Sequence, residues 1–570
     1  MKNQDIARIF QEIALYLEMQ EENVFKIRAY ENAAVSIGSM AEDVEEIYRK
    51  GGVKALQELQ GIGRGLAEKI EEYLKTGRIK YYEELKKAIP VDLSSLSNIE
   101  GLGPKKIKLL YKKLNVRNIE DLQRAAKSGK IRFIPGFGEK TENNILKSIG
   151  FRTRSQGRFT IFEIDPVVAR IEAIMKSVKG VKNIVVAGSY RRRKETIGDI
   201  DILAVSSDRR PVMDAFTSMK NVAAVYGKGN TKSTVRLAEG IDADLRVVEQ
   251  KSFGAALNYF TGSKDHNVAL RKIAIAKGLK LNEYGLFRGK KQIAGESEQD
   301  LYKALGLRYI EPELRENAGE IDASRKNSLP DLIRYDDLKG DLQIQTEWTD
   351  GSASIEEMAV TAKKMDLEYI LITDHTKALA MTGGLDEKKL KKQGEEIDKV
   401  NKKLDGMTIL KGAEVNILKD GSLDINDKAL KDLDIVGVSI HSNFNMPRAE
   451  MTKRILKAIE NPNVDIFFHP TGRILKKREP YDVDMEKIID AAKATGTVLE
   501  VNSLERLDLK DEHVRMAVKA GAKLAINSDA HSPSHFAALP IGIAQARRGW
   551  AEKKDVINAW PLEKMRKMLK

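Results

Sequence analysis

Three acidic residues of the sequence stand where hydrophobic strands are expected. Asp199 and Asp201 belong to the run GDIDIL, and Asp244 opens the run DLRVV. Because side chains alternate along a strand, Asp199 and Asp201 face the same way and can hold two hard divalent cations, with Asp244 closing the set from a neighbouring position. Two such cations activate a hydroxyl for in-line attack on a triphosphate and stabilise the departing pyrophosphate. The pattern predicts nucleotidyl transfer.

A Gly-Ser pair precedes the acidic residues and supports this interpretation. Gly188 and Ser189 would offer a triphosphate a close backbone approach and a hydroxyl donor. An Asp-x-Asp pair by itself is common at turns and strand edges, so the prediction depends on the combination. Enzymes that tail RNA or modify antibiotics share the same constellation, so the residues alone leave the substrate open.

A second group of residues in the last 235 positions is suited to metal binding. Histidines and carboxylates follow several predicted strands, at Asp374-His375, His441, His469 and Asp529-x-His531, with Glu414 between them. A single such histidine is more often a hydrogen-bonded structural residue. Five strand ends that carry these side chains favour one shared site for Zn²⁺, Mn²⁺ or Fe²⁺, since borderline cations accept both imidazole and carboxylate ligands.

The elements that must position these residues differ along the chain. Apolar residues recur at helical spacing over residues 5–75 and again over 80–150. Short β-branched runs then alternate with helical segments up to about residue 318, as in an α+β layer. From about residue 336, strands and amphipathic helices alternate regularly, which predicts parallel strands closed into a barrel with its chemistry at the carboxyl ends of the strands.

A glycine pattern repeats three times in the helical region, as LQGIG, IEGLG and IPGFG. Each copy precedes a helical stretch, and its glycines would let backbone N–H groups approach a phosphate. One copy is more simply a helix cap and turn, whereas three copies favour helix-hairpin-helix elements that hold DNA backbones. The six glycines are Gly61, Gly63, Gly101, Gly103, Gly136 and Gly138.

The composition is compatible with a polyanionic partner. Lys and Arg outnumber Asp and Glu by 97 to 84, which gives a net charge of +13 and a pI near 9.3. The absence of cysteine excludes disulfides and thiolate metal sites. We find neither a signal sequence nor an apolar run long enough for a membrane span, so we expect a cytoplasmic protein with no membrane partner.

Residues 188–201 and 259–263 carry a resemblance to a known family. GSYRRRKETIGDID resembles the palm signature of the DNA polymerase beta-like family X, and YFTGS resembles a second segment of that family, with Asn267, Arg271 and NEYGLF in register after it. The resemblance implies that Asp199, Asp201 and Asp244 are the catalytic triad and hold Mg²⁺ or Mn²⁺. It implies nucleotide contacts by Gly188, Ser189, Arg192, Gly198, Tyr259, Phe260, Gly262 and Asn267, and DNA contacts by Arg246 and Arg271.

The first helical segment resembles the 8-kDa domain of the same family. By this resemblance Lys69 stands at a Schiff-base lysine that removes a 5′-deoxyribose phosphate, and Lys26 and Tyr30 belong to a 5′-phosphate pocket. Phe25 and Gly65 depart from the pattern, because phosphate-contacting side chains are expected there. Lyase activity is therefore an open expectation.

The C-terminal region resembles the PHP domain of bacterial and archaeal family X enzymes, a Mn²⁺-dependent 3′ to 5′ exonuclease and related phosphoesterase. The opening motif reads DLQIQTEWTDG, so Gln343 and Gln345 replace two expected histidine ligands. An amide oxygen is a weaker ligand than imidazole, and one metal position should be weakened or lost. The ligands that remain are Asp350, His375, Glu414, His441, His469, Asp529 and His531.

The resulting prediction is a multidomain chain with N-terminal all-α helix-hairpin-helix domains, an α+β palm and thumb, and a C-terminal α/β distorted (β/α)7-type barrel. The expected boundaries are 1–78, 79–152, 153–250, 251–318, a linker at 319–335, and 336–570. We expect a monomeric DNA polymerase that uses dNTPs on gapped or primer-template DNA in repair. The alternatives are a PHP-type phosphoesterase, or a DNA-end scaffold with a non-polymerising nucleotidyltransferase domain.

Overall fold

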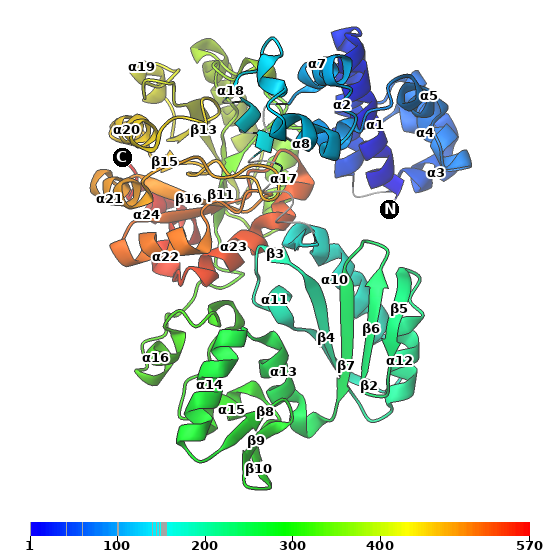
Figure 1. Ribbon diagram of the computed structural model, residues 1–570. Coiled ribbons are helices and arrows are strands. Elements are labelled where there is room, and N and C mark those ends of the chain that lie inside the picture. Colours follow the sequence, from blue (N-terminus) through cyan, green and yellow to red (C-terminus); the bar gives the residue numbers. More distant parts are fainter. Residues whose placement is uncertain are drawn as a thin grey trace.

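The computed structural model describes residues 2–570 apart from 41–42, 60, 98, 100–101, 140, 144, 147–148 and 150–156. Gly101, one of the predicted hairpin glycines, lies outside the described residues. Figure 1 shows a helical N-terminal part, a palm built on a sheet, a thumb beside it, and a barrel that follows in sequence. This arrangement confirms the predicted fold class, while the domain boundaries stay a prediction.

The N-terminal part consists of short helices around one apolar core. Buried side chains from Ile6 to Ile149 form a single cluster. Ile6, Ile13 and Leu17 are buried because they recur on one face of the first helix. The helices are α1 (Lys2–Gln20), α2 (Val24–Ser39), α3 (Val44–Gln57), α4 (Arg64–Thr76), α5 (Lys80–Ala88), α6 (Leu93–Ser97), α7 (Pro104–Leu114) and α8 (Ile119–Lys127).

The palm is a five-stranded sheet in the order β2-β4-β7-β6-β5. Strands β4 and β7 are parallel and the other pairs are antiparallel. Its strands are β2 (Val181–Val186), β4 (Asp199–Ser206), β5 (Val222–Lys228), β6 (Lys232–Leu237) and β7 (Asp242–Val248), with helices α10 (Ile161–Lys176), α11 (Gly188–Arg191) and α12 (Arg209–Thr217). Strand β2 ends at Val186, and Gly188 already begins α11.

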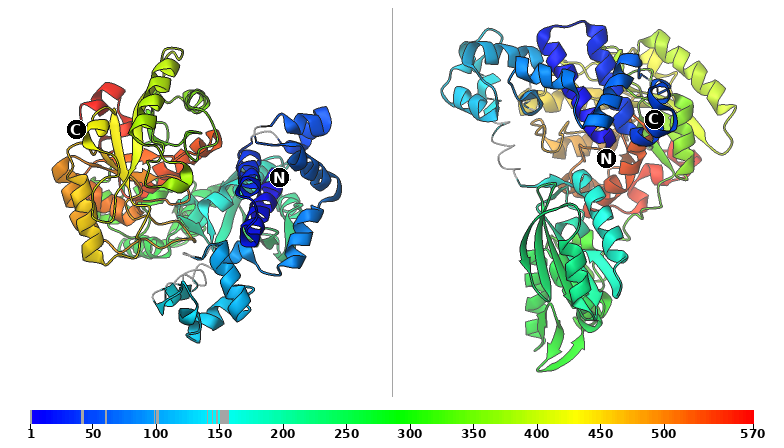
Figure 2. Two further views of the ribbon diagram at one scale, coloured as in Figure 1. Left: turned by 90° about the horizontal axis from the view of Figure 1, so that it is seen from above. Right: turned by 90° about the vertical axis from the view of Figure 1, so that its right-hand side faces the viewer.

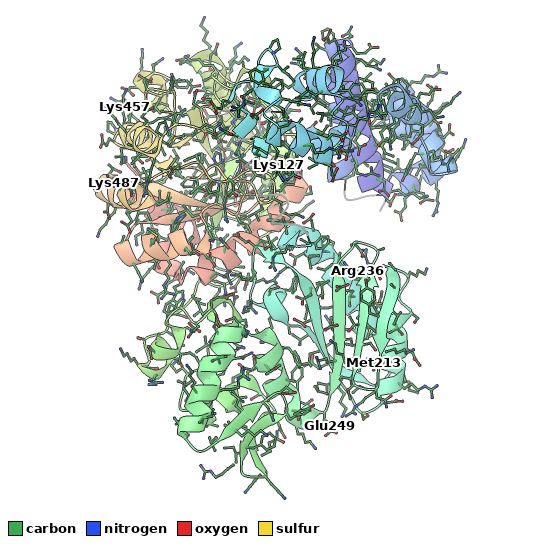
Figure 3. The ribbon with its side chains drawn as sticks, in the orientation of Figure 1. Lys127, Met213, Arg236, Glu249, Lys457 and Lys487 are labelled. Carbon is green, nitrogen blue, oxygen red and sulfur yellow. The ribbon has the colours of Figure 1, made fainter. Side chains whose placement is uncertain are left out.

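The two faces of the palm sheet have different partners. Ile200 and Ile202 of β4 pack in the core under α10 and α12. Met213 of α12, labelled in Figure 3, belongs to the same core. Leu203 lies on the opposite face and packs against Ala256 of α13 (Phe253–Thr261). Strand alternation therefore places Asp199 and Asp201 on the thumb side of the sheet.

The thumb packs around α13 and a small antiparallel sheet, β10-β9-β8. Its other elements are α14 (Lys264–Ala276), β8 (Lys280–Asn282), β9 (Gly285–Arg288), β10 (Lys291–Ala294) and α15 (Glu298–Ala304). Where the sequence predicts a linker, the helix α16 (Glu320–Arg325) forms, and Glu320 is buried against His266 with 2.6 Å between carboxylate and ring nitrogen.

The C-terminal part is a seven-stranded parallel sheet in sequential order. The bridge between Ile344 and Ala530 brings its last strand back to its first, so it curls into a distorted barrel. The strands are β11 (Gly340–Ile344), β12 (Tyr369–Ile372), β13 (Thr408–Asn416), β14 (Ile435–Ser439), β15 (Ile466–Phe467), β16 (Val498–Asn502) and β17 (Leu524–Asn527). Apart from Thr408 and Lys411 of β13, the residues of these strands are buried, as is typical of parallel strands covered by helices.

The outer helices of the barrel are α17 (Ile355–Lys364), α18 (Glu387–Asn401), α19 (Asp427–Leu430), α20 (Arg448–Ile459), α21 (Met485–Thr495), α22 (Asp511–Ala520), α23 (Leu539–Arg548) and α24 (Leu562–Arg566). Lys457 of α20 and Lys487 of α21 lie on the side of the barrel away from the palm (Figure 3). Both views of Figure 2 place the palm next to the red C-terminal segments that include α23. No described helix has the length and apolar character that a membrane span needs.

Candidate active sites

The three palm carboxylates come together through strand register. Asp201 on β4 is the direct partner of Asp244 on β7, and Asp199 pairs with Asp242. Burial, followed by the nearby charges of Asp199 and Asp244, raises the pKa of Asp201 to about 6. Clustered carboxylates that repel one another in this way fit a divalent cation, whose charge would offset the repulsion.

Asp244 is held by the neighbouring strand. Lys232 Nζ lies 2.6 Å from its Oδ2, and Thr234 Oγ1 donates to its Oδ1 at 2.6 Å. Lys232 and Thr234 are both on β6, two residues apart, so they face the same side as the carboxylate. No sequence motif marks these two residues, because only the β6–β7 pairing shows that they meet Asp244.

Gly188 brings the chain close to the carboxylates. Its φ is +62°, and a Cβ built there would lie 2.5 Å from Asp201 Oδ2. Any side chain at 188 would therefore displace a candidate metal ligand. Gly198 is similarly close to Arg158, whose Nη1 would lie 3.0 Å from an added Cβ.

A pocket of about 420 Å³ lies above Asp199 and Asp201. Most predicted nucleotide-contacting residues line it. The lining residues are Arg158, Gly188, Ser189, Arg192, Lys194, Asp199, Asp201, Tyr259, Phe260, Gly262, Lys264, Asn267 and Arg271. Arg158, Lys194 and Lys264 were not predicted, although their charge suits a triphosphate. The pocket thus joins the palm carboxylates to the thumb.

The aromatic pair of the thumb is fixed by its neighbours. Tyr259 and Phe260 meet edge to face with 5.1 Å between ring centroids, and the Arg246 guanidinium lies 4.5 Å from the Phe260 ring centre. Asn267 Nδ2 donates to the Tyr259 carbonyl at 2.7 Å, and Arg271 Nε donates to the Asn267 carbonyl at 3.3 Å. Arg246 therefore packs against Phe260, a residue that lines the nucleotide pocket.

The predicted lysine pair of the helical part shares one aromatic ring. Lys26 Nζ and Lys69 Nζ each lie 5.4 Å from the centre of the Tyr81 ring, and Tyr30 stacks on Tyr81 at 6.4 Å. Lys69 also donates to the Gly65 carbonyl at 3.3 Å. Tyr81 was missed because it lies beyond the predicted first domain and no motif includes it.

The described hairpin glycines stand at helix starts with open space beside them. Gly63 and Gly103 are the N-cap residues of α4 and α7. Among the described residues, an added Cβ would meet nothing within 4 Å at Gly63, Gly103, Gly136 or Gly138, and only Asn32 at 3.9 Å from Gly61. A phosphate oxygen can therefore approach these backbones without a steric barrier.

In the barrel, Glu414 forms the centre of the second candidate site. His469 Nε2 and His441 Nε2 lie 2.8 Å and 3.0 Å from its Oε1. Although burial opposes it, the charge of His375 and hydrogen bonds with His441 and His469 hold the pKa of Glu414 well below its ordinary value. Burial also lowers the pKa of His441 to about 4, which keeps its ring neutral and available as a ligand.

A second set of ligands lies beside the first. His375 Nε2 and His531 Nε2 lie 3.4 Å and 3.7 Å from Asp350 Oδ2. Among the described residues, two groups of three could each hold a metal ion, because their ligand atoms lie within 4.8 Å of one another. One group is Asp350, His375 and His531, and the other is His375, Glu414 and His441. The predicted ligands, Asp529 included, line one pocket of about 410 Å³.

These donors fit divalent metals, with one exception. The Nδ1 atoms of His375 and His469 are buried without hydrogen-bond partners in the structure, as free ligand atoms would be. Gln343 and Gln345 instead point their amide nitrogens at Glu414 Oε2, at 3.1 Å and 2.8 Å. An amide N–H repels a cation, so this corner of the site does not fit a metal as two histidines would.

The barrel pocket also contains residues that the sequence analysis missed. Arg506 lies 3.6 Å from Asp529 through its Nε, and its Nη1 is buried without a hydrogen-bond partner. Leu379, Met381 and Thr382 line the rim, and Met381 is 85% exposed. Nothing in the spacing of these residues distinguishes them from an ordinary loop.

Comparisons with known proteins agree with this geometry. Family models match for the DNA polymerase beta palm over residues 161–243 and thumb over 256–316, a helix-hairpin-helix domain over 1–79, and a SAM-like helix-hairpin-helix tandem over 93–150. DNA polymerase lambda of Rattus norvegicus is 29% identical over 288 residues, which cover 45% of this chain and 48% of the relative.

Two bacterial relatives extend the likeness to the barrel. A probable phosphatase of Thermoanaerobacter sp. (strain X514) is 35% identical over 190 residues, 31% of this chain and 73% of the relative. This match supports the identification of the C-terminal part as a PHP barrel. DNA polymerase/3′-5′ exonuclease PolX of Bacillus subtilis (strain 168) is 36% identical over 578 residues, 100% of both chains. The chain therefore belongs to the family X DNA polymerases that carry a C-terminal PHP domain.

Proposed function

We propose that this DNA polymerase fills short gaps by adding dNMPs to a primer 3′-end at the palm pocket. The observation that carries the proposal is the register of Asp201 with Asp244, on the sheet face that the thumb pocket covers. Asp199, Asp201 and Asp244 would hold Mg²⁺ or Mn²⁺, which would activate the primer hydroxyl and stabilise the leaving pyrophosphate.

The surrounding residues would bind and orient the nucleotide. Ser189 and Arg192, which line the pocket, would contact the triphosphate, and Tyr259 and Phe260 would lie along the sugar. Asn267 and Arg271 would reach the base and the template strand. The glycine hairpins of the helical part, with Lys26 and Tyr30, would hold the DNA backbone on either side of the gap.

We further propose that the barrel removes nucleotides from the primer 3′-end, with Mn²⁺, Zn²⁺ or Fe²⁺ held by Asp350, His375 and His531 and by Glu414, His441 and His469. These cations would supply an activated water and polarise the scissile phosphodiester. Gln343 and Gln345 weaken one corner of this site, so we expect slower cleavage than a complete ligand set would give. Lys69, beside Lys26, is the candidate for lyase chemistry.

One time course tests both activities. A labelled primer on a 5′-phosphorylated one-nucleotide gap is incubated with Mn²⁺, with and without dNTPs. We expect extension with dNTPs and slow primer shortening without them. His469→Ala should abolish shortening and preserve extension, whereas His513→Ala, a histidine of α22 outside the pocket lining, should preserve both.

The outcomes separate the alternatives. A wild-type chain that shortens but never extends the primer would support a phosphoesterase, and one that does neither would support a DNA-end scaffold. Shortening that persists in His469→Ala would remove the barrel site from the proposal. The intact palm carboxylates argue against both alternatives.

A further inference from the structure

The barrel packs directly against the polymerase half through α23. In Figure 1 this helix lies between the barrel and the α11–β3 end of the palm (β3, Thr196–Ile197). An apolar cluster joins Ile161 of the palm to Leu475, Leu507 and Ile541 of the barrel. Two buried arginines at the end of α23, Arg547 and Arg548, point out of the barrel into the thumb and palm.

Arg548 contacts the segment that carries the nucleotide pocket. Its Nη1 donates to the main-chain carbonyl of Arg192 at 2.8 Å and lies 3.2 Å from Glu316 Oε1. Its side chain is only 3% exposed. A buried guanidinium destabilises the fold unless its donors are satisfied, so Arg548 must keep its hydrogen-bond partners in both the barrel and the polymerase half.

Glu316 links Arg548 to the Arg192 side chain. The same carboxylate oxygen, Oε1, lies 3.1 Å from Arg192 Nε and 3.7 Å from Lys194 Nζ. Arg192 Nη1 in turn donates to the Thr261 carbonyl. Although burial opposes it, Arg192, Arg548 and Lys194 hold the pKa of Glu316 below its ordinary value, so the carboxylate stays charged among three cations.

The barrel holds the other end of Arg548. Asp511 Oδ2, at the start of α22, lies 2.5 Å from Arg548 Nη2. The guanidinium therefore bridges a barrel carboxylate and a thumb carboxylate while it binds the palm backbone. We propose that Arg548, a residue of the barrel, is a positioning residue for the polymerase reaction: it fixes the position of Arg192 in the nucleotide pocket and shares the Glu316 carboxylate with it.

The proposal rests on the proposed role of Arg192 in triphosphate binding and predicts a specific kinetic effect. Without Arg548, the Arg192 carbonyl loses a donor and Glu316 Oε1 is left to neutralise Arg192 more fully. Both changes weaken binding of an anionic nucleotide and leave the carboxylate triad untouched. We expect Arg548→Gln to raise KM for dNTP about tenfold, the size of one charge-assisted hydrogen bond, with kcat within about twofold of wild type.

A second interdomain ion pair provides the matched control. Arg473 of the barrel lies 2.9 Å from Glu195 of the palm, and Glu195 is 26% exposed, compared with 25% for Glu316. Glu195 does not line the nucleotide pocket. Glu195→Gln should therefore lower the melting temperature as Arg548→Gln does while KM for dNTP stays at the wild-type value.

Steady-state incorporation on a one-nucleotide gap, in the full-length chain, measures the effect in four variants. Arg548→Lys should recover part of the lost affinity, and Asp511→Asn, a change confined to the barrel, should raise KM in the same direction as Arg548→Gln. An unchanged KM in Arg548→Gln, or an equal rise in Glu195→Gln, would overturn the proposal. A wild-type chain that fails to incorporate would instead contradict the proposed function of the pocket.

Discussion

Gly188→Ala should separate catalysis from stability. The added Cβ would lie 2.5 Å from Asp201 Oδ2 and 3.3 Å from its Cγ. Ordinary contacts between nonbonded heavy atoms are about 3.5 Å or longer, so the carboxylate must shift by roughly 1 Å. The carboxylate is the free end of a side chain and can move without unfolding the palm, but a shift of this size at a catalytic group costs roughly 100-fold in rate.

The stability cost of the same change should be modest. The backbone at Gly188 has a φ of +62°, a region that costs an L-residue about 1–2 kcal/mol. Gly240→Ala is the matched control, because Gly240 lies in the same domain with a φ of +85° and its added Cβ would meet only Phe159 Cζ, at 3.8 Å. Both variants should melt a few degrees below wild type, and only Gly188→Ala should lose incorporation.

Single-turnover incorporation on a gapped duplex and thermal melting of both variants test this reasoning. Equal activity in Gly188→Ala and Gly240→Ala would refute it, since the approach of residue 188 to Asp201 would then have no catalytic consequence. Complete unfolding of Gly188→Ala alone would also contradict it, because the contact would then be a packing contact rather than a constraint on a metal ligand.

The other predictions concern the barrel and the thumb. Gln343→His combined with Gln345→His should increase bound Mn²⁺ by about one ion per chain, because two imidazoles replace the amides that donate to Glu414. Elemental analysis after gel filtration measures the bound metal. An unchanged Mn²⁺ content would contradict the idea that the two glutamines stand in place of metal ligands. Glu298→Gln should destabilise the chain by about 3–5 kcal/mol at neutral pH, since the buried Arg315 and the partly buried Arg191 lose the carboxylate between them. Burial opposes the shift, yet Arg315 and Arg191 lower the pKa of Glu298 to about 2. Its contribution is therefore present above its ordinary pKa and disappears as the pH falls toward 2, so melting of wild type and variant should converge in acid.

The grouping of the candidate palm carboxylates could be predicted because the sequence pattern that carries it is local. Alternation along GDIDIL places Asp199 and Asp201 on one face whatever the rest of the chain does, and the pairing with Asp244 follows once β4 and β7 are neighbours. The convergence of the candidate barrel ligands could be predicted as well, since polar residues that follow buried parallel strands meet at one end of the sheet.

The residues that support the sites could not be predicted in the same way. Lys232 meets Asp244 only through the antiparallel pairing of β6 and β7, and Tyr81 meets Lys26 and Lys69 only through helix packing. Arg548 and Arg192 are 356 positions apart and touch only because the barrel docks on the palm. Within the predicted linker, α16 forms where Glu320 pairs with the buried His266, a contact that no local sequence pattern indicates.

The central claim is that the palm carboxylates perform nucleotide addition. Asp201→Ala in the full-length chain, assayed for incorporation and for binding to the same gapped DNA, tests it most directly. We predict that incorporation is lost while DNA affinity stays near the wild-type value, because the proposed contacts to the DNA backbone come from the helical part. Retained incorporation in Asp201→Ala would contradict the account.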